Sequence, residues 1–301
     1  MNIELYIDQP NDYALDIGAP VYHPHVSIIS YDEAGTIRHT LNRFNVYGLF
    51  LQQNFPEDLV YGIGKYDHDN GSLLAYSPGQ IGGKPDDGKT RQYYGWVLLF
   101  DASFIQGTEI ERRLADYHFF SYNTNEALIL TDKEEEILYG LMENIRTELS
   151  QHREEAHTDA IVKDYILLIL DYCKRFYSRQ FKDLSTTGVN ILARFQQLLN
   201  EYYEKGLQLK YGLPSVGYCA RELCLSSGYF GDIIRNAMDD NPKNYINNFV
   251  IMRSKNLLLG GMRVSQVAEE LGFEYANHFT RLFKKITGQT PSEFLASQQQ
   301  K

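Results

Sequence analysis

Val216–Leu225 reads V-G-Y-C-A-R-E-L-C-L, and Val264–Phe273 repeats the pattern as V-S-Q-V-A-E-E-L-G-F. Valine, alanine, glutamate and leucine recur in the two copies at a constant spacing of 48 residues, the difference between 264 and 216. Each copy is followed by apolar residues at positions i, i+3, i+4 and i+7: Phe230, Ile233, Ile234 and Ala237, and then Phe279, Leu282, Phe283 and Ile286. This spacing predicts two helices, each with one buried face.

A short helix, a tight turn at Gly272 and a second, amphipathic helix predict a helix-turn-helix motif, whose second helix usually lies in the major groove of DNA. The alternative is a plain helical bundle that contains two similar hairpins. Against it stands the solvent face of the last helix, which carries Asn277, Thr280, Arg281, Lys284 and Lys285. Asn and Arg can make two hydrogen bonds to adenine and guanine edges, and Lys suits phosphates. The repeat therefore predicts a protein that binds two stretches of DNA groove.

The segment from about Arg194 to Leu295 resembles the DNA-binding domain of AraC/XylS-type bacterial transcription regulators. The residues that carry the resemblance are Gly272-Phe273, Phe279-Thr280-Arg281-Leu282-Phe283-Lys284-Lys285, Gly288 and Pro291-Ser292-Glu293-Phe294. A signature of this length is far more specific than a short glycine motif. The resemblance implies sequence-specific binding of double-stranded DNA.

Contacts to DNA are expected from both motifs and from the final helix. The candidates are Ser227, Tyr229, Arg235 and Asn236 in the first motif, Asn277, His278, Thr280, Arg281, Lys284 and Lys285 in the second, and Thr290 and Ser292 at the start of the final helix. The free amides of that helix start could hold a phosphate. The first motif departs from the family pattern at Gly228, Gly231 and Asp232, so the second motif is expected to contribute more affinity.

Charge is divided unevenly along the 301 residues. The total is −10, but residues 206–301 hold 11 basic and 8 acidic side chains, a net +3, which leaves −13 for the preceding residues. Because electrostatic contacts are screened over about 8–10 Å, the charge of the contacting domain matters more than the total. The start of the chain lacks the features of a signal peptide and no apolar run is long enough for a membrane span, so a cytoplasmic protein is expected. Cys173, Cys219 and Cys224 are expected to be buried small hydrophobes.

Short β-branched and aromatic segments separated by turn residues fill the first part of the chain. The expected strands are Val26–Tyr31, Val46–Leu51, Leu59–Tyr66, Ser72–Ser77 and Gly95–Phe100. They predict a β-barrel or sandwich. The resemblance implies a cupin-like barrel over residues 1–130 that binds a small-molecule effector, which makes the whole chain an α+β protein.

His23-Pro24-His25 raises the alternative of a cupin-type, metal-dependent enzyme tethered to a DNA-binding domain. A cupin metal site also needs a nearby carboxylate and a later histidine, and His39, His68 and His118 lack that spacing. No nucleophile–base pair or phosphate-binding loop is evident. The chain is therefore expected to be a regulator without a metal, a cofactor or catalysis.

Helical periodicity begins with a capping box at Thr131 and Glu134. Two helices, to about His152 and from about Thr158 to Gln180, form a hairpin over residues 131–181 that resembles the dimerisation hairpin of the family. Its seam would be Val162, Ile166, Ile169, Cys173 and Phe176, although the same residues could pack on their own barrel. Residues 182–190 are the expected linker and 191–301 the DNA-binding domain.

A helix from Pro242 to Leu259 is expected to separate the two motifs by roughly 27 Å, about one turn of DNA. A homodimer is expected, and RNA polymerase is a further candidate partner.

Overall fold

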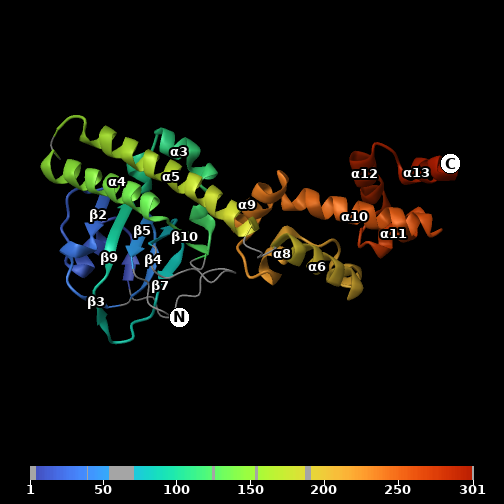
Figure 1. Ribbon diagram of the computed structural model, residues 1–301, viewed down its shortest axis with the longest axis horizontal. Coiled ribbons are helices and arrows are strands. Elements are labelled where there is room, and N and C mark those ends of the chain that lie inside the picture. The colour runs from blue at the N-terminus through green and yellow to red at the C-terminus, as the bar shows by residue number, and fades with distance from the viewer. Residues whose placement is uncertain are drawn as a thin grey trace. The chain divides into compact units, whose positions relative to one another are not determined.

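The computed structural model describes residues 5–38, 40–53, 71–123, 126–152, 155–186 and 191–299. The chain divides into two compact units, Met1–Asp183 and Leu184–Lys301, which are described separately (Figure 1). Among the described residues, no helix is both long enough and apolar enough to cross a membrane.

Three sheets make up the β-structure that is described in the first unit. Their strands are β1 (Leu5–Ile7), β2 (Val26–Ser30), β3 (Ile37–Arg38), β4 (Leu41–Phe44), β5 (Tyr47–Gln53), β6 (Ser72–Tyr76), β7 (Ile81–Gly83), β8 (Thr90–Arg91), β9 (Tyr94–Phe100) and β10 (Leu128–Ile129). The largest sheet has the order β10-β6-β5-β9-β2, and all its neighbours are antiparallel. The other two are β1-β4-β7 and β3-β8.

Four of the five expected strands are confirmed as β2, β5, β6 and β9, and the fifth, Leu59–Tyr66, lies outside the described residues. The described sheets are not closed into a barrel. The α+β class is thus correct at the level of mixed sheet and helix, whereas the cupin-like barrel stays a prediction.

Aromatic side chains fill the core between the sheets. Phe44 stacks on Tyr76 with ring centroids 4.3 Å apart, and Phe50 meets both rings edge-on. The hydroxyls of Tyr13 and Tyr31 lie 3.1 Å apart in the same cluster, and burial raises the pKa of Tyr31 to about 12. Buried aromatic rings contribute large apolar areas, so this cluster stabilises the packing of the sheets.

Short helices and turns surround the sheets. They are α1 (Asp12–Ile17), α2 (Ala102–Ile105), α3 (Glu109–Arg113) and the 3-10 turns η1 (Tyr31–Glu33), η2 (Leu114–Asp116) and η3 (His118–Ser121). Two long helices, α4 (Asp132–Gln151) and α5 (Thr158–Thr186), lie side by side, and α4 contacts β2 and β9 (Figure 1). The capping box that starts α4 is confirmed, because the Thr131 amide donates to Glu134 Oε2 at 2.9 Å.

The α5 residues expected to form a dimer contact are buried within the first unit. Val162, Ile166, Ile169 and Cys173 have no exposed surface, and Phe176 is 3% exposed. Further along α5, Gln180 accepts from the Ile129 amide at 2.7 Å and donates to the Ala127 carbonyl at 3.1 Å. The seam therefore packs on its own unit and is not available to a second copy.

The first residues of the expected linker are helical, and the rest of it stays a prediction. Helix α5 continues to Thr186, so residues 182–186 are helical, and residues 187–190 lie outside the described residues. Lys182 to Thr186 contain no glycine or proline, so no residue of this stretch is a strong helix breaker.

The described residues of the second unit form helices joined by short turns. Its helices are α6 (Ile191–Glu204), α7 (Gln208–Tyr211), α8 (Val216–Glu222), α9 (Ser227–Met238), α10 (Pro242–Leu259), α11 (Val264–Glu270), α12 (Ala276–Thr287) and α13 (Pro291–Gln299). The pairs α8–α9 and α11–α12 are the two expected hairpins, and α10 joins them with the predicted bounds (Figure 1). Asn241 caps α10 by accepting from the Asn244 amide at 3.0 Å.

Both apolar stripes are buried at their first positions and end earlier than expected. Phe230, Ile234, Phe279 and Phe283 have no exposed surface. The last members, Ala237 and Ile286, are exposed instead of buried.

The turns of the two hairpins share one hydrogen-bond pattern. Cys224 donates to the Arg221 carbonyl and Gly272 to the equivalent Glu269 carbonyl, each at 2.9 Å. Both residues adopt positive φ, +60° at Cys224 and +86° at Gly272. Cys224 is also exposed, so its predicted burial is wrong, whereas Cys173 and Cys219 are buried as expected.

A glycine and a cysteine in this conformation are expected to respond oppositely to substitution. Cys224→Gly should raise the free energy of unfolding by about 0.5–1 kcal/mol, because it relieves the left-handed strain of a side-chain-bearing residue. Gly272→Ala should lower it by about 1–3 kcal/mol, since its Cβ would lie 2.7 Å from the Gln208 carbonyl oxygen. Urea unfolding of the full chain, followed by circular dichroism, measures both. Destabilisation by Cys224→Gly would contradict the strain at this turn.

Candidate nucleic-acid interface

Helix α12 separates a buried aromatic face from an exposed polar face. The Phe279 ring lies 5.4 Å from Phe273 and the Phe283 ring 5.7 Å from Phe294. Asn277, His278, Arg281, Lys284 and Lys285 are all exposed. Because the aromatic contacts fix the rotation of the helix, the predicted base-reading side chains point into solvent.

Three cations of this face are available to a partner. Arg281, Lys284 and Lys285 form no ion pair with any residue in the described parts of the chain. Residues 281 and 285 are four apart and share a helix face with residue 277. Thr280 is only half-exposed, and its hydroxyl donates to the Ala276 carbonyl at 3.0 Å, which makes it a weaker candidate for a base contact.

The start of α13 is already capped by the chain. Glu293 Oε2 accepts from the Thr290 amide at 2.7 Å, and the Glu293 amide donates to Thr290 Oγ1 at 3.3 Å. The bond from Thr290 lowers the pKa of Glu293, so the carboxylate stays charged beside these amides. A phosphate here would meet that negative charge, and Ser292, which is exposed, is the better of the two predicted contacts.

The first motif offers fewer contacts than the sequence suggests. Tyr229 is only 3% exposed, so this conformation does not favour a contact from its side chain to DNA, and its role stays a prediction. Arg235 forms an ion pair with Asp232, and the side-chain amide of Asn236 (Nδ2) donates to the Asp232 backbone carbonyl at 2.8 Å. Ser227 is exposed beside Ser226, which caps α9 by accepting from the Tyr229 amide at 3.2 Å. Only Ser227, Arg235 and Asn236 of the predicted four reach the surface.

Residues that the sequence did not single out hold the second motif in place. Gln208 Nε2 donates to the Glu270 carbonyl at 3.1 Å, and the Tyr203 hydroxyl donates to the Leu271 carbonyl at 3.4 Å. Both bonds satisfy carbonyls at the C-terminal end of α11. A glutamine and a tyrosine more than 60 positions away in sequence carry no motif, so these positioning contacts emerge only from the fold.

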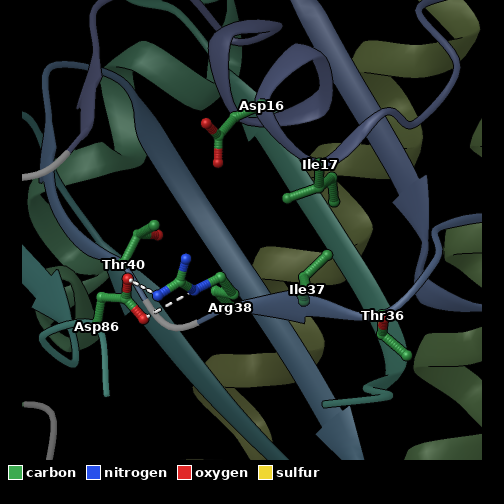
Figure 2. A pocket seen from close by; sticks show the side chains of 7 residues that line it. All are labelled: Asp16, Ile17, Thr36, Ile37, Arg38, Thr40 and Asp86. Carbon is green, nitrogen blue, oxygen red and sulfur yellow. Dashed lines mark hydrogen bonds and ion pairs between the residues drawn. The ribbon is translucent and has the colours of Figure 1, made fainter. Parts of the chain in front are cut away.

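An open pocket of about 490 Å³ lies on the first unit, between α1 and β3 (Figure 2). Its lining residues are Asp16, Ile17, Thr36, Ile37, Arg38, Thr40 and Asp86. Arg38 Nη2 pairs with Asp86 at 2.6 Å, and the Asp16 carboxylate points into the same space (Figure 2). Hydroxyls, two carboxylates and one guanidinium suit a small polar ligand.

The His23 and His25 side chains are held by different carboxylates. His23 Nε2 lies 3.3 Å from Asp159 and His25 Nδ1 lies 2.8 Å from Asp101, with the two rings 5.9 Å apart. Burial lowers the pKa of His23, and Asp159 opposes that shift. No cluster of three or more metal-binding side chains occurs among the described residues. His39 and His68 lie outside the described residues.

Two helix-turn-helix hairpins on a connecting helix, with a basic exposed face on the second, define a DNA-binding domain. Residues 219–297 match the model of a helix-turn-helix domain family. The second unit therefore carries an AraC-type helix-turn-helix domain, as the repeated motif predicted.

The chain is also similar to an uncharacterised HTH-type transcriptional regulator of Escherichia coli strain K12, YijO. The two are 24% identical over 148 residues, which are 49% of this chain and 48% of that protein. The chain thus spans about half the length of this curated relative.

The chain is also similar to several solved structures, of which two follow. The C-terminal domain of the two-component response regulator yesN from Fusobacterium nucleatum is 25% identical, with 33% of this chain and 95% of that chain covered and a TM-score of 0.29. ToxT from Vibrio cholerae is 16% identical, with 90% of this chain and 96% of that chain covered and a TM-score of 0.30.

Substitutions on α12 should separate base reading from phosphate binding. Arg281→Ala should cost about 1–3 kcal/mol of discrimination between a selected and a scrambled duplex, because a base-reading contact is lost. Lys285→Ala, the matched control on the same face, should weaken binding to both duplexes equally and reduce the salt slope by about 0.9. Fluorescence anisotropy at several salt concentrations measures both effects. Unchanged affinity and discrimination in Arg281→Ala would remove this residue from the interface.

Proposed function

We propose that the protein is a one-component transcription regulator that binds promoter DNA through its second unit and senses a small molecule through its first. The observation that carries the proposal is the exposed α12 face of Asn277, Arg281, Lys284 and Lys285 within an AraC-type domain. Free cations beside an amide side chain on a groove-binding helix supply both affinity and base discrimination. Such a protein acts in the cytoplasm, and RNA polymerase is its candidate partner at the promoter.

Selection of bound sequences from random duplex DNA by the full chain tests the DNA-binding part. A site with two conserved segments about one helical turn apart is expected, because α10 spans 18 residues, or roughly 27 Å. Enrichment of one segment would assign sequence reading to one motif. No enrichment over the starting pool would overturn the proposal.

The effector is proposed to occupy the pocket of Asp16, Arg38 and Asp86. The aromatic core between the sheets is tightly packed, so the open pocket is the better place for a ligand of the first unit. Thr36, Thr40 and the carboxylates suit a ligand rich in hydroxyl or amino groups.

A panel of sugars, amino acids and amines should contain a compound that raises the melting temperature of the full chain. The Asp16→Ala variant should lose that shift, because it removes a charged hydrogen-bond acceptor from the pocket. Asp116→Ala, an exposed carboxylate outside the pocket, should keep it. A shift that survives Asp16→Ala and Arg38→Ala together would place the effector elsewhere.

The second candidate function is a cupin-type metal-dependent enzyme tethered to DNA, favoured by the proximity of His23 and His25. Elemental analysis of the purified protein decides between the two. Stoichiometric iron, zinc or manganese would favour the enzyme.

A homodimer is proposed to form through the outer face of α5. Ile161 and Leu168 are 38% and 43% exposed there, and Tyr165 and Tyr172 continue the same face with spacings of four and three residues. Asp159 and Asp164 lie near the start of α5, and Lys174 and Arg175 lie further along it. An antiparallel pairing of two copies would bring these opposite charges together.

Leu168→Glu should therefore convert a dimer into a monomer, because two buried charges would face each other at the centre of the pairing. Light scattering after size-exclusion chromatography measures the mass. Leu15→Glu is the matched control, since Leu15 is 68% exposed and lies outside α5. A wild-type monomer, or a Leu168→Glu dimer, would contradict the arrangement.

A further inference from the structure

The two reading helices can be aligned residue by residue. Phe230 and Phe279 hold the same place in the two buried stripes, which sets an offset of 49 residues. With this offset, Asp232 stands where the second helix has Arg281, and Arg235 stands where it has Lys284. The charge at the main base-reading position is thus reversed between the motifs.

The carboxylate in the first motif is directed at its own helix. Asp232 forms an ion pair with Arg235, and their side chains are 9% and 50% exposed. The pair has no net charge, whereas Arg281 and Lys284 at the equivalent positions carry two positive charges and no ion pair with a described residue. Gly228 and Gly231, at the places of Asn277 and Thr280, add no side chain that could compensate.

This difference has a direct effect on binding to a polyanion. A cation that neutralises a phosphate releases a counterion, and that release dominates affinity. Arg235 is already paired with the Asp232 carboxylate, and the phosphates of DNA would repel that carboxylate. The first motif therefore gains less from the duplex than the second motif does.

We propose that Asp232 is a specificity-determining residue that keeps the affinity of the first motif low by holding Arg235. The second motif then selects the site, and the first motif adds binding energy only once the second is engaged. A chain with two equally basic motifs would bind any duplex more strongly and discriminate less. The inference rests on the DNA-binding function proposed above.

Asp232→Asn tests the proposal in the full chain, with a labelled duplex of random sequence as the probe. One additional phosphate contact should raise affinity about fivefold at 0.15 M salt and about fifteenfold at 0.05 M, with the salt slope steeper by about 0.9. The gain should disappear in the double variant Asp232→Asn/Arg235→Ala. Asp239→Asn is the matched control, since it removes the same charge from the exposed end of α9 at a left-handed position that asparagine tolerates.

A second measurement avoids substitution of the buried carboxylate. Arg235→Ala should reduce the salt slope by less than half as much as Lys284→Ala does, because Arg235 is already paired. Equal slope changes would show that Arg235 contacts phosphate freely, and would overturn the proposal. An equal gain of affinity in Asp232→Asn and Asp239→Asn would also overturn the proposal. A loss of affinity in Asp232→Asn with an unchanged melting temperature would overturn it too, because Asp232 would then be a base-reading group.

These outcomes are separate from failure of the DNA-binding function itself. If the wild-type chain binds no duplex at any salt concentration, the proposed function fails. If the wild type binds and loses affinity with Arg281→Ala, but Asp232→Asn gives no gain at low salt, only the role of Asp232 fails.

Discussion

Burial of phenylalanine rings beneath the two reading helices is the contact on which the DNA-binding unit depends. Phe230 lies 5.0 Å from Phe195, and Phe279 and Phe283 are covered by Phe273 and Phe294. Each ring removes a large apolar area from water, so the rotation of each helix about its axis is set by these rings. On α12, Asn277, Arg281, Lys284 and Lys285 opposite these rings are then presented to solvent. The first unit uses the same principle, with α5 held to it by buried side chains and by the hydrogen bonds of Gln180.

Much of the second unit could be predicted from sequence because its signals are local. Helix periodicity, the capping serine before α9 and the proline that starts α10 each act within one or two turns. The exposed α12 residues could be predicted for the same reason. The left-handed conformation at Cys224 is also predictable, because the repeat aligns this residue with Gly272. Its exposure is not, because cysteine as a residue type favours burial.

What could not be predicted depends on contacts between distant segments. The seam of α5 has the same spacing whether it meets a second copy or its own sheet, so periodicity does not identify the partner. The burial of Tyr229 and the pairing of Arg235 with Asp232 depend on rotamers and neighbours that residue type does not specify. Closure of a barrel likewise depends on strand pairing over long range, and the described sheets do not show it.

The length of the connecting helix α10 restricts how the two reading helices can be oriented relative to each other. Its ends are fixed by Asn241 and Gly260, and it lies against α9, α11, α12 and α13. In a continuous helix, each inserted or deleted residue turns everything beyond it by about 100° and moves it by about 1.5 Å. One extra residue in α10 would therefore aim the two reading helices at different sides of the duplex while leaving each of them intact. The length of α10 thus sets the angular phase between the motifs, and evolution can vary its exposed side chains far more freely than its number of residues.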